Sequence, residues 1–535
     1  NKLLSIVRKP VFDSSSGFKL SKFLVHIFSC SVVFLLSVSY LKMIQISFQY
    51  PDYIAPFIPL WFAQSIIPLG LMLIWYQLIM TSSSNFKLRT IISLLSILPA
   101  IILIYWQFPL SSPFLLWMKV IFAISLLAFG LPIFILLAAL AIFFFLSEPS
   151  EWATNFDLIS TISDSAYRIV VSPTLAAIPI FTLAGYLLAE SNISERLLHF
   201  FKSCLGWIPG STVLIVVLLC AFFTALTGGS GVTILALGAI LYPILIEDGY
   251  SKKFSLGLIT TAGSIGLLFP PSLPAIIYSV TAGINPLDLF KQGFLPAVFL
   301  LLVVFVYGLQ SKSFSSNKHT FNLKSAVKSI KEASWEIIIP ILIIASLFSG
   351  FATLVECAAL LVFYVVFVEV VVYKDITFEE IPKIIINCST LVGGVLIILG
   401  FAMGFTGYLV DAQVPLKILH FVQSSISSKI IFLLALNILL LIIGCIMDVF
   451  SAIIVVVPLI APLASYFGID PIHLAIIFIA NLELGYITPP VGMNLYLSSY
   501  RFEKDMPTIY AATLPFFFIR LIGVLMITYI PLFFY

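Results

Sequence analysis

The chain has 535 residues, of which 61% are hydrophobic and only 10% are charged, and its mean hydropathy is +1.16. So apolar a composition indicates a membrane protein, because a water-soluble core could not bury this much hydrophobic surface. The 27 Lys plus Arg nearly balance the 24 Asp plus Glu, and no basic tract suits a nucleic acid. Six cysteines without CxxC spacing favour neither a disulfide framework nor a zinc site. No metal-spaced His or Asp cluster and no nucleophile with a base is visible, so an enzyme is not expected.

Three apolar runs open the chain, at residues 23–48, 54–80 and 90–108, and each is long enough for one membrane-spanning helix. Five basic residues precede the first run, and Lys87 and Arg89 precede the third. By the positive-inside bias both of these ends are expected in the cytoplasm, which places the uncharged loop 109–113 outside.

The next apolar run, residues 114–146, contains Gly130 and Pro132, which would kink a membrane helix without ending it. Residues 147–172 are polar with interspersed aromatics, and they fit an interfacial helix slightly better than a loop. Membrane character resumes at residues 173–188. The segment 311–332 carries five lysines and is predicted to be a cytoplasmic linker between two halves of the chain.

An internal repeat is visible on either side of this linker. In each copy a glycine stands 21 positions before a Pro-Pro pair, and a second glycine lies four positions before the same pair. Pro243 and Pro458 lie in long apolar runs upstream of these motifs. Many transporters are built from two inverted copies around a central site, so the spacing predicts that architecture. The matched residues are Gly249, Gly266 and Pro270-Pro271 in the first copy, and Gly468, Gly485 and Pro489-Pro490 in the second.

Each Pro-Pro pair should break its membrane helix, because it removes two backbone donors and the preceding glycine weakens the same turn. The carbonyls freed by such a break are tolerated in a membrane where they line a cavity or bind a cation, and sodium is the natural occupant. A purely structural kink is the alternative. The recurrence of the break at matched spacing favours the ion site.

A small-residue segment at 227–233 separates two apolar runs of roughly 15 residues, each too short to span with ease. This pattern predicts a re-entrant hairpin whose tip reaches the middle of the membrane. Glycines there permit close backbone approach, and Ser230 and Thr233 offer hydroxyl ligands. A helix-packing motif of small residues is the alternative.

In the second copy, Asp448 lies in an otherwise uncharged run, where an unpaired carboxylate would be costly, so it is a functional candidate. Its alternative role is to hold a neighbouring helix. Glu483 is a further candidate ion or proton ligand, and Glu356 is a less informative one. Arg520 is expected to be an interfacial anchor and His473 a satisfied residue at a helix end.

From about residue 116 onward the chain resembles the large, DctM-like membrane subunit of TRAP transporters. Residues 54–80, with IPLW at 58–61 and PLG at 68–70, look like the last helix of the small, DctQ-like subunit. The motifs that carry the main resemblance are GLP at 130–132, IPIFTLAG at 178–185, GSGVT at 229–233, GLLFPPS at 266–272 and TPPVGMNL at 488–495.

The resemblance implies an all-α polytopic inner-membrane protein of the inverted-repeat elevator type, with two re-entrant hairpins and two broken helices. Residues 1–85 would be small-subunit helices, either truncated or reduced, because two helices stand where the family usually has four. Residues 86–113 would be a connector, and 114–535 the permease, with repeats at about 170–310 and 335–535. The implied function is sodium-coupled uptake of an organic acid, such as sialic acid or a C4-dicarboxylate, delivered by a periplasmic binding protein to a monomeric unit.

Site residues follow from the resemblance together with the predicted breaks, and sodium is the only ion or cofactor expected. The expected substrate-binding residues are Ser230, Ser272, Asp448 and Asn494. The expected sodium-binding residues are Gly229, Ser230, Gly231, Thr233, Gly266, Pro270, Asp448, Gly485, Thr488 and Pro489.

Two other functions remain open at this point. One is a related carboxylate transporter that works without a binding protein, which the missing small-subunit helices would suit. The other is an inactive membrane scaffold, against which the retained Ser230, Asp448 and paired breaks argue. The sequence does not identify the acid, the number of sodium ions or the oligomeric state.

Overall fold

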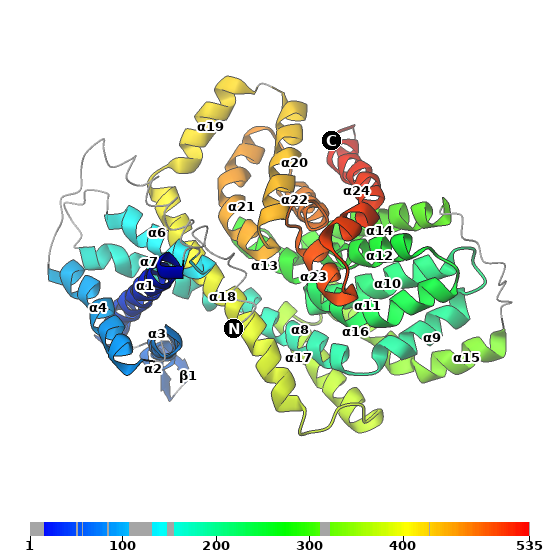
Figure 1. Ribbon diagram of the computed structural model, residues 1–535, viewed down its shortest axis with the longest axis horizontal. Helices are drawn as coiled ribbons and strands as arrows, with labels where there is room; N and C mark the ends of the chain where they lie inside the picture. Colours follow the sequence, from blue (N-terminus) through cyan, green and yellow to red (C-terminus); the bar gives the residue numbers. More distant parts are fainter. Residues whose placement is uncertain are drawn as a thin grey trace. The chain divides into compact units, whose positions relative to one another are not determined.

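The computed structural model describes residues 15–49, 52–55, 57–82, 85–105, 131–146, 155–310, 322–426 and 428–533. Across these ranges the protein is almost entirely helical, and its only strands are the short antiparallel pair β1 (Tyr53–Ala55) and β2 (Ile58–Pro59). Ten helices in the described part are long and apolar enough to cross a membrane. The prediction of an all-α polytopic membrane protein is confirmed (Figure 1).

The chain forms two compact units. The first comprises residues 1–171 and 394–414, and the second comprises residues 172–393 and 415–535. Helix α18 (Ile381–Asp411) contributes to both of them.

In the first unit, α1 (Ser15–Gln49) packs against α3 (Ile66–Ser82), α4 (Phe86–Tyr105) and α7 (Asn155–Val170). The Trp75 indole donates a hydrogen bond to Ser96 Oγ over 3.0 Å, which joins α3 to α4. The C-terminal part of α18 packs on α6 (Ile133–Leu146), where Phe401 stacks on Phe134 at 6.4 Å between ring centroids.

The predicted elements of this unit are found with shifted bounds. The second span begins at α2 (Leu60–Gln64) rather than at residue 54, because the residues before it form the strand pair. The polar segment before residue 172 contains a helix, α7, which buries Ile159, Ile162 and Ala166 on one face. Residues 106–130 and 147–154 lie outside the described residues, and with them the loop 109–113, residues 114–130 of the predicted run 114–146, and Gly130 of its predicted kink.

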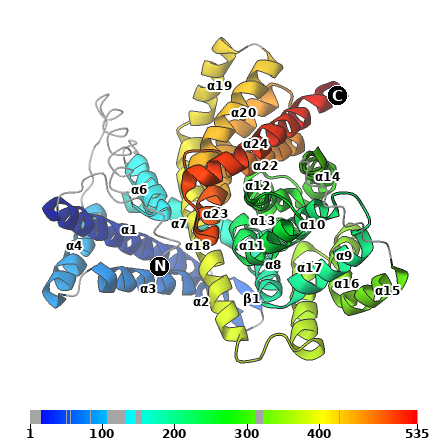
Figure 2. The same ribbon diagram turned by 45° about the vertical axis from the view of Figure 1, so that its right-hand side comes forward.

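The second unit contains the whole first copy of the repeat and all of the second copy except residues 394–414; its helices are labelled in Figure 2. Its first copy runs through α8 (Pro173–Glu190), α9 (Ile193–Leu205), α10 (Ser211–Thr227), α11 (Ser230–Glu247), α12 (Lys252–Ala262), the short 3-10 helix η1 (Ile265–Leu268), α13 (Leu273–Ala282) and α14 (Pro286–Gln310). The second copy runs through α18, α19 (Val414–Ser425), α20 (Lys429–Ile446), α21 (Val449–Tyr466), α22 (Pro471–Gly485), α23 (Met493–Phe502) and α24 (Met506–Tyr529). Between the copies lie α15 (Leu323–Glu332), α16 (Ser334–Phe348), α17 (Leu354–Val366) and the π-helix η2 (Phe367–Val372).

A constant offset of 219 residues relates the two copies. Ser230 and Val449 begin α11 and α21, and Lys252 and Pro471 begin α12 and α22. The remaining starts, those of α10 and α20, α13 and α23, and α14 and α24, agree with the same offset to within one residue. This offset pairs Pro243 with Pro462, where the sequence had suggested Pro458. The two copies therefore share one order of hairpin, broken helix and long closing helix.

Candidate functional site

Each copy contributes one helical hairpin with a sharp tip. In the first, α10 ends at Thr227 and is capped by Gly228, whose φ of 66° is the left-handed conformation that glycine adopts without strain. Gly229 then precedes α11 in an extended conformation. In the second, α20 and α21 meet at Met447 and Asp448. The two predicted hairpins are therefore present as helix-turn-helix elements.

Each copy also contributes one broken helix. The pair α12–η1 and α13 bends by 43° around Pro270-Pro271. The second break separates α22 from α23 and contains Pro489-Pro490. Both helices stop within a few residues of their predicted glycines, because the Pro-Pro pairs cannot continue the ladder of helical hydrogen bonds.

The glycine of each break packs directly on the hairpin of its own copy. A Cβ on Gly266 would lie 2.4 Å from the Ala221 carbonyl oxygen and 2.9 Å from the Ala225 amide nitrogen. A Cβ on Gly485 would lie 2.6 Å from the Cα of Gly444, which is the counterpart of Ala225 at the offset of 219. Only glycine permits this backbone approach, so both glycines set the distance between hairpin and break.

The first hairpin tip reaches the broken helix of the other copy. Ser230 Oγ donates to Asn494 Oδ1 over 2.6 Å, and Asn494 Nδ2 donates to the Thr260 carbonyl over 3.2 Å. The side chains of Ser230 and Asn494 are 1% and 0% exposed, so this pair is a fixed part of the interior. Two predicted substrate residues, 264 positions apart in the sequence, are thereby brought together.

A hydroxyl chain that the sequence did not suggest continues behind this tip. Thr233 Oγ1 lies 2.7 Å from Thr224 Oγ1, which donates to the carbonyl of Gly263 at the first break. Thr224 lies in the last turn of the apolar helix α10, and only its partners in space distinguish it from an ordinary core threonine.

At the second tip, Asp448 caps the N-terminus of α21. Its Oδ2 accepts the N–H groups of Phe450 and Ser451 at 3.1 Å each, and its Oδ1 accepts the Ser451 hydroxyl at 2.6 Å. Three donors and the positive end of the helix dipole therefore compensate the half-buried carboxylate. Within the described residues no hydrogen bond joins Asp448 to Ser230 or Asn494.

The remaining predicted residues lie at the tips and at the breaks. Ser272 caps α13, accepting from the Ala275 N–H at 3.4 Å and donating to the Leu267 carbonyl. Thr488 donates to the Leu484 carbonyl over 2.8 Å, and the Gly492 N–H donates to the Cys445 carbonyl over 3.1 Å, which ties the second break to the second hairpin. Gly231 and Pro270 lie at the first tip and the first break, and Pro489 is exposed at the second break.

The charged residues of uncertain role are now placed. The expectation that Arg520 is an interfacial anchor is wrong, because its side chain is 0% exposed and forms an ion pair with Glu483. Glu356 belongs to a capping box with Thr353 at the start of α17. His473 Nε2 lies 3.0 Å from the Ile527 carbonyl, so the expectation of a satisfied residue at a helix end is confirmed.

A second charge cluster lies away from the tips, around Arg196 of α9. Its guanidinium contacts Asp375 Oδ2 at 2.5 Å and Glu369 Oε2 at 3.1 Å, pairs with Glu336, and stacks 3.9 Å from the Tyr373 ring centroid. Burial raises the pKa of Asp375, but hydrogen bonds from Arg196 and from a backbone N–H outweigh it and lower that pKa. Because these residues come from four separate segments, no local pattern in the sequence indicates the cluster.

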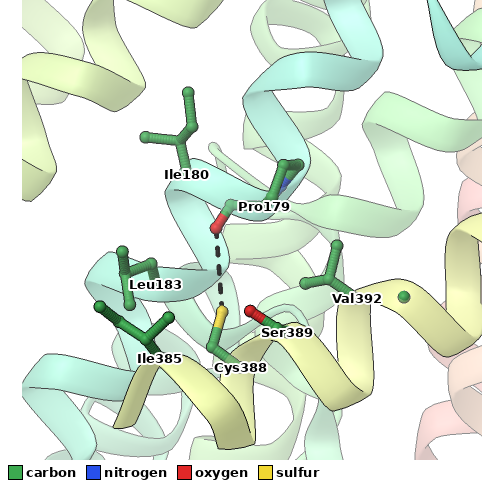
Figure 3. Close-up of a pocket in the computed structure, with 8 residues that line it drawn as sticks. Pro179, Ile180, Leu183, Ile385, Cys388, Ser389 and Val392 are labelled. Carbon is green, nitrogen blue, oxygen red and sulfur yellow. Dashed lines mark hydrogen bonds between the residues drawn. The ribbon is translucent and has the colours of Figure 1, made fainter. Parts of the chain in front are cut away.

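A cavity of about 300 Å³ lies between α8 and the N-terminal part of α18 (Figure 3). Pro179, Leu183 and Ile385 give it an apolar lining, and Cys388 Sγ donates to the Pro179 carbonyl over 3.8 Å. None of the predicted site residues lines this cavity, so it is separate from the tips and breaks.

Comparison with known proteins now identifies the family. The model of the family described as "Tripartite ATP-independent periplasmic transporter, DctM component" matches residues 120–533, more than three quarters of the chain. The chain belongs to the DctM family. It is accordingly a TRAP transporter membrane component and a multi-pass protein of the bacterial inner membrane.

Two relatives illustrate the match. The chain is 34% identical over 360 residues to the C4-dicarboxylate TRAP transporter large permease protein DctM of Pseudomonas aeruginosa. This match covers 67% of this chain and 84% of the relative. It is 30% identical over 376 residues to the isethionate TRAP transporter permease protein DctMQ of Oleidesulfovibrio alaskensis. This second match covers 70% of this chain and 59% of the relative.

Among solved structures, the crystal structure of the Alcanivorax borkumensis YdaH transporter superposes with a TM-score of 0.52. The superposition covers 69% of this chain and 87% of that chain at 14% sequence identity. This likeness supports the polytopic transporter fold of the DctM-like part.

Proposed function

We propose that the protein is the membrane component of a sodium-driven TRAP system, which takes up a small organic acid handed over by a periplasmic binding protein. Residues 1–85 would serve as small-subunit helices fused through a connector at 86–113, and the fused chain would act as a monomeric unit. No soluble enzyme activity is part of this proposal.

The observation that carries the proposal is the contact of the first hairpin tip with the broken helix of the other copy. The hydrogen bond from Ser230 to Asn494 brings the tip of one repeat to the half-helix that follows the break of the other. Transporters with discontinuous helices bind substrate and ions at such repeat interfaces, where helix ends and unwound backbone meet.

Sodium binding is supported by the chemistry of the two breaks. Hard cations prefer oxygen ligands, and carbonyls that leave a helical ladder are available to serve as such ligands. We assign sodium to the residues that the sequence suggested around the tips and breaks, with Asp448 as the one carboxylate among them. Ser230, Ser272, Asp448 and Asn494 would contact the substrate.

The two hairpins offer different environments to an anion. The N-terminus of α11 has no side-chain cap, whereas that of α21 is capped by Asp448. A helix N-terminus attracts carboxylates through its free N–H groups and its dipole, so the acid group of the substrate should prefer the Ser230 tip. The names of the relatives, a C4-dicarboxylate and an isethionate transporter, agree with a small organic acid, and sialic acid is a further candidate.

An elevator motion would carry the bound substrate across the membrane. Both hairpins and both broken helices belong to one compact unit, and the N-terminal helices belong to the other. This division supports a mechanism in which a transport domain within the second unit, carrying both hairpins and both broken helices, moves against a scaffold that includes the first unit.

The test is uptake into proteoliposomes that contain the purified protein. Uptake should need an inward sodium gradient and the purified binding protein together. Uptake driven equally well by a proton gradient in sodium-free buffer would refute sodium coupling. Sodium-driven uptake without any binding protein would favour instead the related transporter that works alone, and binding without uptake would favour an inactive scaffold.

A further inference from the structure

A fully buried arginine lies between the two broken helices. Arg520 occupies the middle of α24, and its side chain is 0% exposed. Its Nη1 donates to Ser264 Oγ over 3.0 Å, and its Nη2 pairs with Glu483 Oε2. A charge buried at membrane depth is expensive, so such a residue is expected to have a function and a named partner.

The two partners of Arg520 are equivalent positions of the repeat. Ser264 and Glu483 are separated by the same 219 residues that relate the copies, and each lies at the break of its own helix. Ser264 Oγ also lies 3.5 Å from the Glu483 carbonyl oxygen. One guanidinium therefore links the break of the first copy to the break of the second.

The local electrostatics suit a fixed cation. Helices α12 and α22 both end at the breaks, and helix C-termini carry partial negative charge. Glu483 adds one carboxylate, so Arg520 neutralises a region that would otherwise be negative. Both charged side chains are 0% exposed, which leaves little solvent screening between them and the nearby breaks.

Stability alone does not explain this ion pair. Within the described residues, Glu483 Oε1 and Arg520 Nε have no hydrogen-bond partner although both atoms are buried. A buried pair with unsatisfied atoms is commonly no more stable than a well-packed apolar pair, whereas a neutral ion pair does fix geometry and local charge.

We propose that Arg520 is a positioning residue for ion coupling, a built-in cation that holds the two breaks in register and, with Glu483, sets the charge felt by the sodium sites. This inference rests on the proposed sodium-coupled function. Its electrostatic signature is that loss of the Glu483 charge and loss of the Arg520 charge change the sodium affinity in opposite directions.

The experiment measures the sodium concentration for half-maximal uptake by variants in proteoliposomes. Glu483→Gln leaves a positive charge beside the sites and should raise that concentration, whereas Arg520→Gln leaves a negative charge and should lower it. Each shift should be about tenfold, the scale of one buried charge acting over ~10 Å at an effective dielectric constant of ~20. The double variant E483Q/R520Q restores neutrality and should return to within about threefold of the wild type.

Two milder variants keep the test informative where a single charge change prevents folding. Arg520→Lys keeps the charge, but an ammonium group cannot bond to Ser264 and Glu483 with the planar geometry of a guanidinium. Ser264→Ala removes the hydrogen bond from Arg520 to the first break. Both should raise the half-maximal sodium concentration about threefold. Ser279→Ala is the matched control, since among the described residues the hydroxyl of this buried serine of α13 bonds only to the Ala275 carbonyl of its own turn.

Three results are distinguishable. Opposite shifts in the two Gln variants, or the paired shifts of R520K and S264A against an unchanged S279A, support the inference. Lower melting temperatures with unchanged sodium dependence in all of these variants would overturn it and leave a structural ion pair. Uptake by the wild type that does not depend on sodium would refute the proposed function, and this inference would fail with it.

Discussion

The two hairpins of the repeat share their backbone plan but differ in chemistry at the tip. At the offset of 219 residues, Gly229 of the first tip corresponds to Asp448 of the second. The first tip is uncharged, and its hydroxyl is bonded to the opposite copy. The second tip places a carboxylate over its own helix N-terminus. The duplication therefore keeps the frame constant while the chemistry of the two tips diverges.

Under the proposed function, this difference would let a pseudo-symmetric frame bind two kinds of ligand. A free helix N-terminus and an uncharged glycine tip attract an organic anion, whereas a tip whose helix dipole is already neutralised by Asp448 does not. The remaining oxygen atoms of the second tip and its break are then available to a cation. Changes that exchange or erase this difference should affect transport more than changes that only alter packing.

The largest effect is expected for Asp448→Asn. Asparagine keeps the shape and remains a good N-cap, so the protein should fold with a nearly unchanged melting temperature. Sodium-coupled uptake should fall by at least about tenfold because the only charge at this tip is lost. Asp470→Asn is a matched control, since Asp470 caps α22 through the N–H groups of Ile472 and His473 in the same way. Full activity of D448N would remove Asp448 from the ion site.

Gly229→Asp copies the second tip into the first and should be nearly as harmful to uptake. A Cβ at Gly229 meets nothing within 4 Å, and its φ of −141° suits any residue, so the variant should fold. The new carboxylate would cap α11 and repel the substrate anion, so we expect about a tenfold loss of uptake. Gly229→Ala should retain activity. Equal activity of G229D and wild type would show that the first tip does not face the anion.

Gly266→Ala and Gly485→Ala test whether the frame is indeed the same in both copies. Each added methyl group would lie under 3 Å from backbone atoms of the neighbouring hairpin, and backbone atoms, unlike a flexible side chain, cannot rotate away from it. We expect each variant to lose about 1–3 kcal/mol of stability, seen as similar drops in melting temperature. Gly393→Ala, with nothing within 4 Å of its Cβ, is the control. A large drop in only one copy would contradict the shared frame.

Ser230→Ala should have the smallest effect. It removes one hydroxyl and leaves Asn494 Oδ1 without that donor, but the backbone N–H groups of the tip remain. We expect uptake to fall about threefold. In free energy this is no more than the net contribution of one ordinary hydrogen bond. The substrate concentration for half-maximal uptake is the readout. A loss as large as that of D448N would place the critical chemistry at the first tip.

The sequence predicted the parts of this site that depend on local chemistry. Pro-Pro pairs and glycines break helices wherever they occur, so both breaks were predicted from their spacing. The first tip was predicted from its small residues, and the second hairpin was expected only from the family resemblance. The pairing of Ser230 with Asn494 and of Arg520 with Glu483 depends on how distant helices pack, and no local pattern encodes it. The start of the second span was also misplaced, since an apolar run does not distinguish a short strand pair at 53–59 from the first turn of a helix.

The most direct test of the central claim, that the second tip holds sodium, measures the melting temperature of the purified protein without substrate. A ligand that binds the folded state at ~100 times its dissociation constant stabilises that state by about 2.7 kcal/mol. Wild-type protein should therefore melt a few degrees higher in sodium chloride than in choline chloride at equal ionic strength, whereas D448N should melt at the same temperature in both. An equal sodium-induced increase in wild type and D448N, or none in wild type, would contradict the claim.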